Sequence, residues 1–135
     1  MNYPALLCAI ALVETGVDDH AVGAHGERGR YQISEVVWKQ HSHLHFDFAH
    51  DPITATSVAN THLRWLVKHE VLVLPDHLAF AWHHGLLAYC RHHTKYGAHI
   101  HDDFSTRVLN IYSLTPQCNP LTNVSAKLPS GGTNK

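Results

Sequence analysis

The chain has 135 residues, of which 44% are hydrophobic and 16% charged, and its formal net charge at pH 7 is −1. This is the size and composition of one globular domain with enough apolar material for a core, which excludes a disordered chain. The near-neutral net charge argues against a nucleic-acid-binding protein, which would carry an excess of basic residues. No apolar run is long enough to predict a membrane span. Histidine is the exceptional residue: there are 15, against 10 lysines and arginines, so the surface charge is expected to depend strongly on pH.

The first predicted helix begins at Tyr3 and ends near Thr15 and Gly16. It is apolar on nearly all sides, which predicts a central, buried helix. Cys8, within this apolar run, is expected to be buried as well. The glycine-rich segment 17–30 is predicted to be a loop.

Five more helices are predicted: a short one capped by Ser34, a long amphipathic one that begins at Asp51 and Pro52, one over residues 77–84, one over part of 86–96, and a last one capped by Asp102 or Asp103. After Pro116 the composition shifts to Asn, Pro, Ser, Gly and Thr. We therefore predict a mainly α single domain over residues 1–115 and a flexible tail over residues 116–135.

Glu14 is the residue with the clearest chemical potential. A glutamate that closes an apolar helix is expected to be partly desolvated, which disfavours its charged form and raises its pKa. A carboxylic acid that is still protonated near neutral pH can donate a proton to a glycosidic oxygen. The plain alternative is a helix-terminal side chain that points into water.

Three segments follow Glu14-Thr15-Gly16 in a characteristic order: G-E-R-G-R-Y-Q-I at 26–33, A-F-A-W-H-H-G at 79–85, and F-S-T-R-V-L-N-I-Y at 104–112. Together these four segments resemble the motifs of the lysozyme-like lytic transglycosylase family, the soluble lytic transglycosylase domain. The resemblance covers residues 6–112. It implies a lysozyme-like domain built around a buried N-terminal helix that carries the catalytic Glu14.

The family cleaves the β-1,4 bond between N-acetylmuramic acid and N-acetylglucosamine in peptidoglycan. The resemblance implies that Glu14 protonates the leaving oxygen and then accepts a proton from the muramic 6-hydroxyl, giving a 1,6-anhydro product. The expected partner is the glycan strand of peptidoglycan. The protein is expected to be a monomer and to need no cofactor or metal. The location would be extracytoplasmic, although no export signal is visible in the sequence.

The resemblance also implies a set of substrate-binding residues: Thr15, Gly29, Tyr31, Gln32, Ser34, Trp82, His83 and His84. A Cβ at Gly26 or Gly29 is expected to obstruct a backbone turn near the cleft, and the Gln32 amide is expected to orient Glu14 or the N-acetyl group. Trp82 would either pack beneath the cleft or stack on a sugar. Two positions depart from the family: His83 stands where an asparagine is usual, and Phe104 where a tyrosine hydroxyl approaches the acid.

Three alternatives stay open. A lysozyme-type hydrolysis needs a second carboxylate, for which Glu27 is preferred over Asp18 and Asp19 in the same loop. The departures at His83 and Phe104 favour a catalytically weak peptidoglycan-binding relative. A third alternative is a histidine-dependent metal protein, which is suggested by the H-x-H-x-H run at 41–45 and the other histidine pairs. None of these histidine groups has the spacing of a known metal motif. Otherwise most histidines are expected to be exposed, where they would form a cationic surface at acidic pH.

Overall fold

The computed structural model describes residues 1–97 and 99–114, so the predicted tail over residues 116–135 lies outside the described residues. The described part is mainly α-helical and contains no strand, which confirms the predicted fold class at that level. Its elements in chain order are α1 (Tyr3–Thr15), α2 (Glu35–His41), the 3-10 helix η1 (Phe46–His50), α3 (Pro52–Lys68), α4 (Pro75–His84), α5 (Leu86–Tyr96) and α6 (Asp103–Leu114). None of these helices is long and apolar enough to span a membrane.

Local signals determine the helix ends. The side chains of Ser34 and Asp51 accept hydrogen bonds from the first turns of α2 and α3, as predicted. Gly16 ends α1 in the left-handed conformation, at φ 69°. Helix α4 begins at Pro75, two residues before the predicted start, because a proline needs no hydrogen-bond partner in the first turn.

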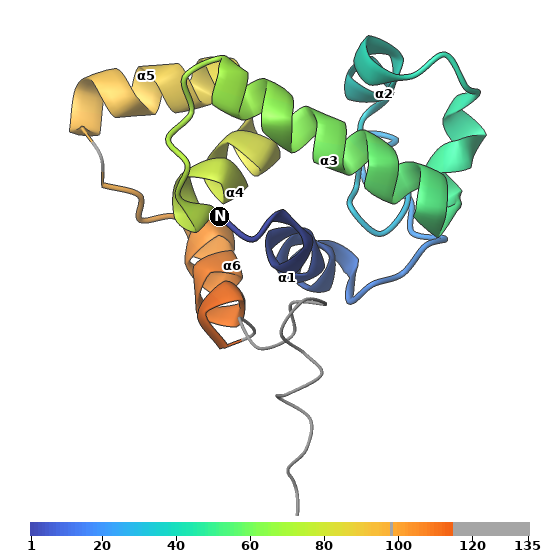
Figure 1. Cartoon of the computed structure of the whole chain (residues 1–135), viewed down its shortest axis with the longest axis horizontal. Helices are drawn as coiled ribbons and strands as arrows, with labels where there is room; N and C mark the ends of the chain where they lie inside the picture. The colour runs from blue at the N-terminus through green and yellow to red at the C-terminus, as the bar shows by residue number, and fades with distance from the viewer. Residues whose placement is uncertain (98, 115–135) are drawn as a thin grey trace, which may run out of the picture.

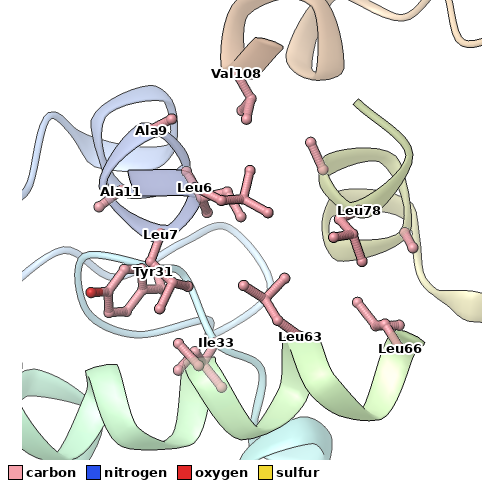
Figure 2. Packing of buried hydrophobic residues seen from close by; sticks show 14 of the residues in the cluster. Leu6, Leu7, Ala9, Ala11, Tyr31, Ile33, Leu63, Leu66, Leu78 and Val108 are labelled. Atoms are coloured by element: carbon pink, nitrogen blue, oxygen red, sulfur yellow. The ribbon is translucent and has the colours of Figure 1, made fainter. Parts of the chain in front are cut away.

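Helix α1 lies beside α6 and beneath α3, and its buried face forms the centre of the core (Figure 1). Figure 2 shows Leu6 of α1 pointing toward Leu63 of α3, Leu78 of α4 and Val108 of α6, and all four side chains are fully buried. Burial of each such side chain contributes about 1.5–3 kcal/mol to folding. The core therefore holds in place the helix whose last turn carries Glu14.

The prediction that Cys8 is buried is wrong, because its side chain is exposed. Helix α1 has one solvent-facing stripe at helical spacing, formed by Pro4, Cys8 and Leu12. The residues of this stripe are as apolar as the buried ones, so hydrophobic patterning gave no signal of the exposed side.

Candidate active site

Glu14 lies in the last turn of α1, and its side chain is 12% exposed. Burial, together with the negative charge of Glu27, raises the pKa of Glu14 to about 7. A hydrogen bond from the Trp82 side chain acts in the opposite direction. Near neutral pH a large fraction of Glu14 is therefore protonated and able to donate a proton.

Two hollows adjoin at His83 and His84. The Glu14 hollow, of about 420 Å³, is lined by Glu14, Phe104 and Arg107 in addition to the two histidines. The Trp82 hollow, of about 360 Å³, lies on the other side of them, between α2, α3 and the junction of α4 with α5. Its polar and aromatic lining includes Glu27, Gln32, Ser34, Gln40, His62, Trp65 and Trp82. A hollow with a few polar groups among aromatic rings is a typical ligand site.

Glu27 lines the Trp82 hollow, and its side chain is 29% exposed. Hydrogen bonds from the backbone N–H groups of Glu27 itself and of His25 lower the pKa of Glu27, and the His25 N–H donates to Glu27 Oε1 at 3.0 Å. Glu27 is therefore ionised where Glu14 is largely protonated. Two carboxyl groups whose environments push their pKa values apart are the arrangement that acid–base cleavage of a glycoside uses.

His83 lines the hollow of each carboxyl group. Its Nδ1 is 3.9 Å from Glu14 Oε2, and its ring stacks on Phe104 with the ring centres 4.3 Å apart and an interplanar angle of 12°. Burial, followed by the charge of His84, lowers the pKa of His83. Phe104 thus supports one face of the imidazole.

His84 and Asp102 form a second polar pair beside the Glu14 hollow. His84 Nε2 lies 3.3 Å from Asp102 Oδ2. Asp102 also caps α6, because Ser105 N–H donates to the same oxygen at 3.3 Å. Asp102 and Asp103 were the two predicted caps of this helix, and Asp102 is the residue that caps it.

Trp82 and Ser34 both line the Trp82 hollow. The indole N–H of Trp82 also donates to the carbonyl oxygen of Tyr31 at 3.2 Å, and its ring is half-buried. Ser34 Oγ accepts the N–H of Val37 at 3.2 Å as the cap of α2. Each of these residues therefore has a structural contact in addition to its place in the hollow.

Two residues predicted to bind substrate, Tyr31 and Thr15, have structural contacts and line neither hollow. Tyr31 is buried in the core, lines neither hollow, and has its hydroxyl 2.8 Å from Thr56 Oγ1. The Thr15 hydroxyl donates to the carbonyl oxygen of Arg30 at 3.0 Å and accepts the N–H of Asp18 at 2.9 Å. Thr15 thus holds the loop 17–30 to α1, and Tyr31, the residue after the loop, contacts α3.

Gln32 lines the Trp82 hollow, and its amide donors bond to backbone carbonyl groups of the neighbouring loop. Its Nε2 donates to the carbonyl oxygens of Gly29, at 3.0 Å, and Ala21, at 3.4 Å. These bonds hold a tight loop in which Gln32 itself has φ 53°. The amide donors thus hold the loop that carries Glu27, and a contact of the Gln32 amide with a sugar stays a prediction.

Gly29 is required for a different reason from the one predicted. It has φ 78° and is buried, and a Cβ there would collide with the carbonyl oxygen of Ala49 in η1. Gly26 has φ 83° with open space around it. The close approach at Gly29 therefore joins the loop to η1 and does not line the cleft.

The loop also contains an ion pair. Arg30 donates from Nε and Nη2 to the two carboxylate oxygens of Asp19, at 2.7 and 2.9 Å. This bidentate pair occupies the Asp19 carboxylate. Asp18 is exposed and lines neither hollow. Of the three carboxylates in this loop, only Glu27 therefore lines a hollow beside Glu14.

The buried His62 forms a pair with the half-buried His41 that was not predicted from the sequence. His62 Nδ1 lies 2.9 Å from His41 Nε2, and the His62 ring stacks on Trp65 and meets the edge of Trp82 at the Trp82 hollow. The signal was present, because His62 recurs with the apolar residues of α3 at helical spacing. Nine of the 15 histidines are exposed, as expected for most of them.

The buried His62 is expected to make the fold sensitive to acid. Burial lowers the pKa of His62 from 6.5 to about 4, so between these pH values the unfolded chain binds one more proton than the native one. Stability should fall by about 3 kcal/mol as the pH drops from 6.5 to 4. Urea unfolding of His62→Gln should lack this part of the acid dependence, whereas replacement of the exposed His69 by Gln should retain it. An unchanged acid dependence in His62→Gln would contradict the assignment.

Within residues 1–97 and 99–114, no three His, Cys, Asp or Glu side chains converge to form a metal-binding group. The sequence matches no family model and no curated protein.

Proposed function

We propose that this chain cleaves the β-1,4 bond between N-acetylmuramic acid and N-acetylglucosamine in peptidoglycan, with Glu14 as the proton donor. The single observation that carries the proposal is a buried carboxyl group, with a pKa of about 7, that opens into a hollow. The same proposal includes a lysozyme-like arrangement of the helices around α1. It is supported by the resemblance of four sequence segments to the motifs of lytic transglycosylases.

In the proposed reaction, the Glu14 proton moves to the glycosidic oxygen as the bond from that oxygen to the anomeric carbon breaks. The 6-hydroxyl of the muramic residue attacks the anomeric carbon and loses its proton to a base, which closes the 1,6-anhydro ring. The Trp82 and Trp65 rings would contact the apolar faces of the sugars, and Ser34 and Gln40 would offer polar contacts. Glycan strands are outside the cytoplasm, so the protein would act there, as a monomer without a cofactor.

Hydrolysis is a second candidate because of one observation at Glu27. This carboxylate is ionised, lines the adjoining hollow, and is close enough to raise the pKa of Glu14 by its charge. In that reaction Glu27 would activate a water molecule, which would attack the anomeric carbon in place of the 6-hydroxyl.

Digestion of purified sacculi followed by mass analysis of the products tests both candidates. The proposed reaction yields 1,6-anhydro muropeptides, each lighter by one water than the reducing-end product of hydrolysis. Glu27→Gln should leave the anhydro products in place, whereas products of hydrolysis should disappear in that variant. If sacculi bind the protein but release no muropeptides, the protein is a binding relative and the proposed cleavage is wrong.

A further inference from the structure

We propose that His83 is the base that accepts the proton of the attacking hydroxyl, so that acid and base are two different residues. This inference rests on the proposed function and adds one residue to its chemistry. It applies to the muramic 6-hydroxyl as the nucleophile, whereas in the alternative hydrolysis the base is Glu27.

The distance between the two groups is the first support. His83 Nδ1 and Glu14 Oε2 are 3.9 Å apart, which is too long for a direct hydrogen bond. An oxygen atom seated between them can lie at about 2.8 Å from both, within hydrogen-bond reach of each. His83 also lines both hollows, so a hydroxyl group that arrives from either side meets its ring.

The His83 ring is held in position by its aromatic neighbours. Phe104 stacks against one face, and His84 approaches at an interplanar angle of 82°, with the ring centres 4.8 Å apart. Phe104 carries no polar group that would occupy the imidazole nitrogens. A base fixed in this way loses little rotational freedom when it takes the proton.

The protons balance over one cycle. Glu14 gives its proton to the leaving oxygen and becomes a carboxylate, and the attacking hydroxyl forms its bond to the anomeric carbon and passes its proton to neutral His83. The imidazolium then returns a proton to the Glu14 carboxylate. This return is downhill, because burial raises the pKa of Glu14 to about 7 and lowers that of His83 below 6.5.

Other charged groups near His83 do not reverse this order. The charges of Asp102 and Glu27 raise the pKa of His83, whereas burial and the charge of His84 lower it and dominate. The titratable and charged groups that face the ring are Glu14 from α1, Glu27 from the loop, His84 from α4, Asp102 before α6, and Asp103 and Arg107 from α6.

The rate of sacculus digestion as a function of pH tests the assignment. The wild type should give a bell-shaped profile, because Glu14 must be protonated and His83 neutral. His83→Ala should lower kcat by about 10²- to 10⁴-fold and lose the acidic limb, and added imidazole should restore part of the rate. The exposed His43, outside both hollows, supplies the control: His43→Ala should keep the wild-type profile.

Two results would overturn the inference, and they are distinguishable. If the wild type digests sacculi and His83→Ala retains the rate and the acidic limb, then His83 is not the base, while the proposed function stands. If the wild type releases no muropeptides at any pH, then the proposed function fails and the role of His83 fails with it. Because the His83 side chain is 43% exposed, its truncation is compatible with folding, which thermal unfolding of the variant would verify.

Discussion

Glu14→Gln is expected to make the fold more stable at about pH 8 by about 2–3 kcal/mol, although it removes the proposed catalytic acid. Burial raises the pKa of Glu14 from 4.5 to about 7, so the native state binds more protons than the unfolded chain between these values. The wild type therefore loses stability as the pH rises from 4.5 through 7. A glutamine side chain carries no charge and should not show this loss.

Urea unfolding at about pH 5 and about pH 8 measures the effect. The stability difference between Glu14→Gln and wild type should be larger at the higher pH by the stated amount. Replacement of the exposed Glu70 by glutamine should show no comparable pH-dependent gain. If Glu14→Gln behaved like Glu70→Gln, Glu14 would be an ordinary solvated carboxylate and the acid role would lose its physical basis.

Gly29→Ala should cost far more stability than Gly26→Ala, although both glycines occur in the same motif. Each has a positive φ that costs an L-residue about 1–2 kcal/mol. Only at Gly29 would the new methyl group meet a backbone atom, the Ala49 carbonyl oxygen, which adds about 1–3 kcal/mol of overpacking. The total for Gly29→Ala is then about 2–5 kcal/mol.

The two glycine variants form a matched pair for thermal or urea unfolding. Equal losses of stability would show that the contact between the loop and η1 does not restrict residue 29. A normal stability for Gly29→Ala combined with weakened binding to sacculi would instead favour the sequence-based expectation that this glycine borders the cleft.

The features that the sequence predicted well are local ones. Ser34 and Asp51 cap their helices because a cap needs only a side-chain oxygen two or three residues before a free backbone N–H group. The rest of the fold does not affect this hydrogen bond. The position of Glu14 followed in the same way from the apolar helix that ends beside it. These inferences needed only the order of residues along the chain.

The features that the sequence did not predict depend on contacts between distant segments. Tyr31 and Gln32 are neighbours in one motif. Tyr31 is nevertheless buried in the core with its hydroxyl group against Thr56, whereas Gln32 lines the Trp82 hollow. The burial of His62 against His41 and Trp82 likewise needs three elements to meet. Residue type alone does not reveal such environments.

The release of soluble muropeptides from purified sacculi at about pH 6.5, with wild type and Glu14→Gln at equal concentration, tests whether Glu14 is the acid. We predict release by the wild type and a rate about 10²- to 10⁴-fold lower for Glu14→Gln. Equal release by the two proteins, or no release by the wild type, would contradict the assignment of Glu14 as the acid that cleaves the glycan.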